Sequence, residues 1–174
     1  MLELYVIDAK DDKRVPVVVD TATEQDFEIT SDWQTSWLSA EASVMPNKVA
    51  LHRVDTGELL GLMSYVVDGR NLAVEIVYIE SAKHSNANML QRGYPKKYIG
   101  IAKALFAYAI NVSKAAGFDG IIVFKAKTTR LMEHYMDEFG AKHAGSYDPF
   151  RLILWEDRAA EILADFEQGG NANE

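Results

Sequence analysis

The heptapeptide Lys96–Ala102 is the stretch whose residue types could most readily do chemistry. It reads Lys-Lys-Tyr-Ile-Gly-Ile-Ala and lies where apolar spacing predicts the start of a helix, Tyr98–Ala116. The first turn of a helix carries unpaired N–H groups and the positive end of its dipole, while a glycine lets an anion approach the backbone. The stretch therefore predicts a pyrophosphate-binding turn, although glycine and lysine are also common at helix starts that bind nothing.

Two glutamates on a predicted strand, Leu72–Glu80, are candidates for proton transfer. Glu75 lies within the apolar run AVEIVYI, where an unpaired carboxylate would be costly, so we expect it to have a partner or a function. A period of two places Glu75 and Glu80 on opposite faces of the strand unless a bulge intervenes. For each, a solvated outward-facing carboxylate is an equally favoured alternative.

Hydrophobic periodicity and turn residues predict the elements that must position these groups. Strands are predicted at Leu2–Ala9, Val15–Asp20, Lys48–Val54, Leu59–Val67, Leu72–Glu80, Gly120–Ala126 and Phe150–Trp155. Pro16 favours a strand start or a sheet edge for the second of these. Helices are predicted at Tyr98–Ala116 and Arg158–Phe166, and from a cap at Thr128 or Thr129 to about Phe139, where Gly140 ends the helix. A further helical segment is predicted within Thr21–Met45, capped by Ser31 or Asp32. The order predicts an α+β fold with one parallel crossover through the first long helix.

Composition restricts the function classes. The 174 residues favour one domain, expected at 1–167, with a disordered tail at 168–174. A net charge of −8 disfavours a nucleic-acid partner, and the absence of cysteine excludes disulfides, thiolate zinc sites and a cysteine nucleophile. Four scattered histidines indicate no metal site. No signal peptide and no membrane-spanning stretch is found, so a cytoplasmic protein with no membrane partner is expected.

The stretch Lys97-Tyr98-Ile99-Gly100-Ile101-Ala102 resembles the signature of the GNAT superfamily of acyl-CoA-dependent N-acetyltransferases. That signature is Arg or Gln, any two residues, Gly, any one residue, and then Gly or Ala. In this chain Lys97 stands where the signature has Arg or Gln. The ending Phe139-Gly140-Ala141-Lys142 is also similar to a frequent family pattern. The resemblance covers about Val49 to Trp155 and implies the GNAT fold, a mixed, mostly antiparallel central sheet flanked by helices.

The resemblance implies transfer of an acetyl group from acetyl-CoA, as cosubstrate, to a primary amine by direct attack. Tyr135 occupies the position where many members place the tyrosine that protonates the thiolate, although it could be only a core residue of its helix. Glu75, where some members carry a catalytic glutamate, or Glu80 would be the general base. The implied cofactor-binding residues are Ile79 and Ser81 for the pantetheine arm, and Lys96, Lys97, Tyr98, Ile99, Gly100, Ile101 and Ala102 for the pyrophosphate.

The alternative function is a catalytically inactive GNAT-fold module that binds acyl-CoA or a protein partner. The acceptor would be a small-molecule or peptide amine, and the negative charge favours a cationic one. Arg92, Lys96 and Lys97 form the local cationic cluster. Acceptor choice should depend on the first 47 residues and the loop Ala82–Pro95, where His84 could contact the substrate. The oligomeric state stays open, with a homodimer as one alternative.

Overall fold

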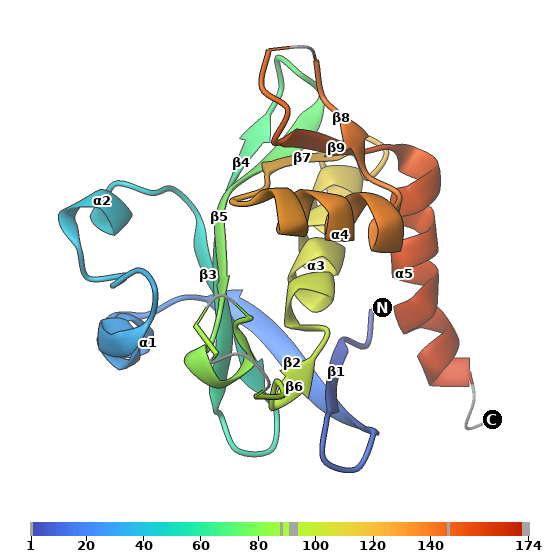
Figure 1. The fold of residues 1–174 in the computed structure, drawn as a ribbon. Helices are drawn as coiled ribbons and strands as arrows, with labels where there is room; N and C mark the ends of the chain where they lie inside the picture. Colours follow the sequence, from blue (N-terminus) through green and yellow to red (C-terminus); the bar gives the residue numbers. More distant parts are fainter. Residues whose placement is uncertain (1, 88, 91–93, 146, 172–174) are drawn as a thin grey trace. The chain divides into compact units, whose positions relative to one another are not determined.

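The computed structural model describes residues 2–87, 89–90, 94–145 and 147–171 (Figure 1). Its strands are β1 (Tyr5–Asp8), β2 (Lys13–Thr21), β3 (Lys48–Arg53), β4 (Leu59–Asp68), β5 (Ala73–Ser81), β6 (Tyr98–Ile99), β7 (Ile122–Lys125), β8 (Lys142–His143) and β9 (Arg151–Leu154). The helices are α1 (Glu24–Ile29), α2 (Ala40–Ser43), α3 (Ile101–Ala115), α4 (Thr129–Phe139) and α5 (Glu156–Asn171), with short 3₁₀ turns η1 (Thr30–Asp32) and η2 (Lys83–Ser85).

The strands form one mixed sheet in the order β6-β1-β2-β3-β4-β5-β7-β9-β8. The pairing of β5 with β7 is parallel, and α3 lies in the connection between them, which confirms the predicted crossover. The predicted α+β class, with a mostly antiparallel sheet and flanking helices, is also confirmed. Among the residues described, no helix combines the length and the apolar composition that crossing a membrane requires.

The chain folds as two compact units. The N-terminal unit comprises Glu3–Ser64 and Tyr78–Phe106, and the C-terminal unit comprises chiefly Tyr65–Val77 and the chain from Ala107 onward. Each is described by itself below.

In the N-terminal unit, the predicted strands β3 and β4 pair antiparallel as a hairpin, with Gly57 of the connecting turn at a φ of 75°. The prediction that Pro16 starts a strand or lies at an edge is wrong, because it lies inside β2. β2 pairs with β1 up to Pro16 and with β3 from Val17 onward. The Val54 N–H still donates to the Pro16 carbonyl at 3.1 Å, so the proline costs a hydrogen bond only at the end of that ladder.

The segment between β2 and β3 differs from the predicted helix capped by Ser31 or Asp32. The helix α1 is capped by Thr23, whose side chain and that of Asp26 form a capping box, and α2 is capped by Ser39. Trp33 and Trp37 lie outside both helices but are buried in a core cluster. Its other buried members are Ala42, Ala50, Leu59, Leu62 and Ala82. The four-residue spacing of Trp33 and Trp37 therefore reflects the burial of both side chains in this cluster and not a helix.

The helix α3 begins at Ile101, three residues later than predicted. Tyr98 and Ile99 instead form β6, where they pair with Asp8 and Ile7 of β1. Gly100 separates the strand from the helix with a φ of 95°, a conformation that a residue with a side chain rarely adopts. The chain therefore passes directly from a strand into the first turn of a helix at Gly100.

In the C-terminal unit, β7 pairs with β5 and β9, and β9 pairs with β8. The helix α4 has the predicted ends, with Thr128 as N-cap and Gly140 at a φ of 70° as C-cap. The strand β8 was not predicted, because two residues are too few to show a period. The helix α5 extends beyond the predicted Arg158–Phe166 at both ends and reaches Asn171.

Candidate functional site

The N-terminus of α3 has the backbone geometry that the sequence predicts for an anion-binding turn. The first intrahelical bond runs from the Ala104 N–H to the Gly100 carbonyl at 3.0 Å, so the amides of Ile101 and Ala102 precede the helical ladder. A Cβ built on Gly100 would meet no atom within 4 Å. The three predicted residues Gly100, Ile101 and Ala102 thus form an open, glycine-led helix start that could receive an anionic group.

The residues before Gly100 are already engaged within the protein. The Lys97 N–H donates to the His84 carbonyl at 2.9 Å, and the Tyr98 N–H donates to Ser85 Oγ at 2.9 Å. The expectation that the Tyr98 amide holds a pyrophosphate does not fit this structure, because Ser85 already accepts its hydrogen. Ile99 belongs to β6, and Lys96 is exposed. Arg92, the third member of the predicted cationic cluster, lies outside the described residues.

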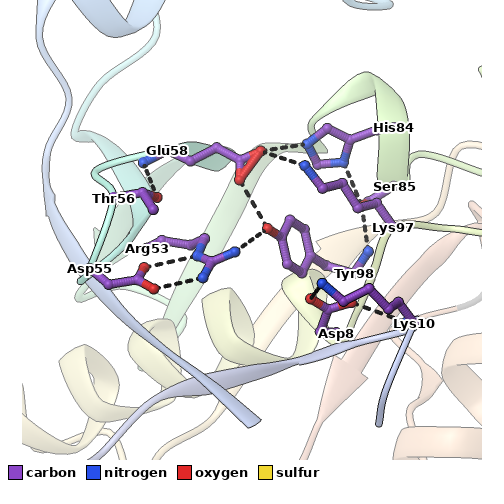
Figure 2. Close-up of polar contacts among 10 residues, drawn as sticks. All are labelled: Asp8, Lys10, Arg53, Asp55, Thr56, Glu58, His84, Ser85, Lys97 and Tyr98. Carbon is purple, nitrogen blue, oxygen red and sulfur yellow. Dashed lines mark hydrogen bonds and ion pairs between the residues drawn. The ribbon is translucent and has the colours of Figure 1, made fainter. Parts of the chain in front are cut away.

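A polar network fixes this turn to two other segments (Figure 2). The Tyr98 hydroxyl accepts a hydrogen bond from Arg53 Nη1 at 2.6 Å and donates to Glu58 Oε2 at 3.0 Å. Glu58 Oε1 lies 3.3 Å from both Lys97 Nζ and His84 Nε2. Burial alone would raise the pKa of Glu58, but hydrogen bonds from Tyr98 and Lys97 outweigh it and lower that pKa.

The ring of His84 links the network to the η2 turn. Its Nδ1 lies 2.7 Å from Ser85 Oγ, the same oxygen that accepts from the Tyr98 amide. Burial is the main cause that lowers the pKa of His84, and the charge of Lys97 adds to it, while Glu58 opposes it. The ring is therefore neutral at pH 7. No pattern in the sequence pointed to Arg53, Glu58 or Ser85 as members of this network, because each meets its partners only through the tertiary fold.

Acidification should weaken the N-terminal unit through His84. Since the pKa of His84 is lower in the folded chain than the ordinary 6.5, the unfolded chain takes up its proton first as the pH falls below about 6.5. Stability from this group is thus present above that pH and lost below it. We expect the Tm to fall between pH 7.5 and 5.5, less steeply in His84→Gln. In the control His134→Gln, which alters an exposed ring, the slope should match that of the unaltered chain. Equal slopes in all three proteins would contradict this role for His84.

The two candidate bases have different surroundings. Glu80 is 2% exposed, and its carboxylate accepts hydrogen bonds from the Gln34 N–H at 2.8 Å and the Thr35 N–H at 3.2 Å. The indole Nε1 of Trp37 donates to it at 3.3 Å. Glu80 therefore anchors the segment that follows η1.

Glu75 has the partner that its apolar surroundings led us to expect. Its Oε1 lies 2.9 Å from Arg151 Nη1 in the C-terminal unit, and both side chains are partly exposed. β5 forms its ladder with β7 through Val74 and Glu75. The predicted pantetheine-binding residues Ile79 and Ser81 are half-buried and lie beyond the end of that ladder.

Tyr135 lies in the C-terminal unit and is 8% exposed. Its ring meets Phe124 edge to face, with centroids 5.3 Å apart, and stacks on Phe139 at 6.1 Å. Burial raises the pKa of Tyr135 to about 12, so the hydroxyl stays protonated at neutral pH and can act as a proton donor. The neighbouring His134 is exposed, as expected.

The N-terminal unit also contains a cavity of about 590 Å³. Its described lining residues come from η1 and from the loop Ala82–Pro95, and they are Asp32, Lys83, His84, Met89, Leu90 and Tyr94. Both segments lie in the regions that were expected, from the sequence, to determine acceptor choice.

Solved structures with the same fold are found, although their sequences differ widely from this one. A GNAT-family acetyltransferase from Listeria monocytogenes is 11% identical with a TM-score of 0.54, over 80% of this chain and 95% of that chain. A spermidine N-acetyltransferase SpeG chimera from Vibrio cholerae and hSSAT is 11% identical with a TM-score of 0.54, over 83% and 98% of the two chains. AtaTR bound with AcCoA is 11% identical with a TM-score of 0.53, over 84% and 97%.

No family model and no curated protein sequence matches the chain. The structural likeness nevertheless extends over most of this chain and nearly all of each solved chain. The chain therefore has the GNAT acyltransferase fold.

Proposed function

We propose that this protein is an N-acetyltransferase that moves an acetyl group from acetyl-CoA to a primary amine by direct attack. The observation that carries the proposal is the open helix start at Gly100, which follows β5 and β6 in a chain with the GNAT fold. Solved structures of this fold include a spermidine N-acetyltransferase chimera and AtaTR with AcCoA bound, which supports both the reaction and the cosubstrate. We further propose that residues 1–167 act as one acetyltransferase domain.

The pyrophosphate of acetyl-CoA would bind at the N-terminus of α3. The amides of Gly100, Ile101 and Ala102 would donate to it, and the helix dipole would favour its negative charge. The ammonium groups of Lys96 and Lys97 would add attraction in a chain whose net charge is −8. Backbone groups of Ile79 and Ser81 would pair with the extended pantetheine arm.

In the chemical step the amine nitrogen attacks the thioester carbon, so a C–N bond forms and the C–S bond breaks. The amine passes its proton to a general base, and Tyr135 donates a proton to the departing sulfur. We favour Glu75 over Glu80 as the base. The Glu80 carboxylate is buried and already accepts hydrogen bonds from three N–H groups, whereas the Glu75 side chain is partly exposed. Tyr135 is suited to its role because its hydroxyl keeps its proton at neutral pH.

Replacing Gly100 with valine should weaken acetyl-CoA binding. A side chain would occupy space beside the start of α3 that is open in this structure, and it would strain a residue whose φ is 95°. We expect the Kd measured by calorimetry to rise at least about tenfold. The matched control is Gly117→Val, since Gly117 also has a positive φ of 85° and open space around it but follows the other end of α3. An unchanged Kd in Gly100→Val would remove the pyrophosphate assignment.

The proposal is tested by titrating acetyl-CoA into the chain and then measuring thiol release with a panel of primary amines. An acetyltransferase binds acetyl-CoA and releases thiol faster when its amine is present. Binding without amine-dependent release for any amine would instead favour the non-catalytic acyl-CoA-binding module.

A further inference from the structure

The cavity of the N-terminal unit has the size and the mixed lining of a small-molecule site. Its volume of about 590 Å³ lies within the roughly 300–1,000 Å³ of typical ligand pockets. Met89, Leu90 and Tyr94 supply apolar surface, and Tyr94 is 66% exposed although it is a large aromatic residue. Such a lining suits a ligand with an apolar body.

The charged groups of the cavity form a pair of opposite sign. Lys83 Nζ lies 3.6 Å from Asp32 Oδ2, and their side chains are 55% and 64% exposed. An ion pair this exposed contributes little to stability, so a ligand can replace or extend it at small cost. A ligand carrying both an ammonium and a carboxylate would match both groups at once.

The walls that carry this pair are held in place by buried contacts. Glu80 lies on β5 just before Lys83, and its carboxylate accepts from the amides of Gln34 and Thr35, just after Asp32. The buried carboxylate of Glu80 therefore joins the segment that carries Asp32 to the segment that carries Lys83. His84 lines the cavity too, but both of its ring nitrogens already lie near Glu58 and Ser85 within the network.

We propose that the acceptor bound in this cavity is a zwitterionic amine with an apolar side chain, of the α-amino-acid class. This inference rests on the proposed function, since it names the substrate of that reaction. The ligand binds with its ammonium paired with Asp32, its carboxylate paired with Lys83, and its side chain in contact with Met89, Leu90 and Tyr94. Before attack the ammonium passes one proton to the general base, so that the neutral nitrogen forms the C–N bond. The net charge of −8 would favour a polycationic acceptor. At the cavity itself, however, the positive charge of Lys83 offsets the negative charge of Asp32, which favours a zwitterion.

The ligand class can be tested by calorimetry on the full chain without acetyl-CoA. The probes are L-leucine, isoamylamine, which lacks the carboxylate, 4-methylpentanoate, which lacks the amine, and spermidine. We expect leucine to bind at least about tenfold more tightly than the other three. Equal or tighter binding of either leucine analogue, or of spermidine, would overturn the assignment.

Variants separate the two charges. Asp32→Asn should weaken leucine and isoamylamine about tenfold and leave 4-methylpentanoate unchanged, whereas Lys83→Met should weaken leucine and 4-methylpentanoate only. The controls Asp20→Asn and Lys13→Met alter exposed charges on β2 and should change no Kd. Leucine binding that is unaffected by both Asp32→Asn and Lys83→Met would overturn the site.

A final assay adds acetyl-CoA and measures N-acetyl-leucine, which the inference requires. Acetylation of spermidine but not of leucine would overturn the inference while supporting the proposed acetyltransferase. Leucine binding without acetylation of any amine would overturn the acceptor role together with the proposed function.

Discussion

Replacing Tyr135 with phenylalanine is expected to lower kcat about 100-fold, the lower end of what a positioned general acid contributes. The variant removes one hydroxyl from a side chain that is 8% exposed and leaves the ring contacts with Phe124 and Phe139 in place. Since burial raises the pKa of Tyr135 to about 12, this hydroxyl is protonated throughout the neutral range. Loss of the donor should therefore slow departure of the thiolate without weakening the binding of acetyl-CoA.

Two measurements make this prediction specific. The Kd for acetyl-CoA and the Tm of Tyr135→Phe should stay close to those of the unaltered chain, so that the effect lies in the chemical step. The matched control is Tyr147→Phe, because Tyr147 is fully exposed in the same unit. A kcat for Tyr135→Phe equal to that of Tyr147→Phe would remove Tyr135 from the mechanism.

Replacing Glu80 with alanine is expected to destabilise the chain more than any other single change considered. Two backbone amides and the Trp37 indole N–H would lose a charged acceptor inside the unit. Leaving buried donors unsatisfied costs about 1–3 kcal/mol each, and partial entry of water reduces the sum to about 3 kcal/mol. For a chain of this length that corresponds to a fall in Tm of about 6–12 °C.

The matched control is Glu75→Ala, which removes a carboxylate from the same strand. Its ion pair with Arg151 is more than one third exposed, so the loss should be less than about 1 kcal/mol. Thermal unfolding of both variants measures the difference, and near-ultraviolet circular dichroism should report the altered surroundings of Trp37 in Glu80→Ala only. Equal Tm values for the two variants would show that Glu80 does not anchor the segment after η1.

The parts of the fold that local chemistry specifies could be predicted from the sequence. Asp55-Thr56-Gly57 between two apolar runs predicts the β3–β4 hairpin, and Thr128 with Gly140 defines both ends of α4. In each case the signal lies within a few residues of the structure that it specifies. The start of α3 was predicted only approximately, since the expected start at Tyr98 lies three residues before the observed start at Ile101.

Other features depend on partners distant in the sequence and could not be predicted. Tyr98 was expected to be helical, but pairing with Asp8 makes it a strand residue, and its hydroxyl binds Arg53 and Glu58. The spacing of Trp33 and Trp37 suggested a helix. The position of Trp37 instead depends on the burial of its side chain and on the hydrogen bond that its indole N–H donates to Glu80. In both cases tertiary contacts outweigh local propensity, so the pattern identifies a residue as buried without revealing its neighbours.

Transfer of a labelled acetyl group tests the central claim most directly. The chain is incubated with acetyl-CoA carrying ¹³C in its acetyl group and with a panel of primary amines that includes apolar α-amino acids, and the amines are analysed by mass spectrometry. The proposed function predicts a ¹³C-acetylated amine whose yield rises with enzyme concentration and falls about 100-fold with Tyr135→Phe. Tight binding of acetyl-CoA without labelled product from any amine would contradict it.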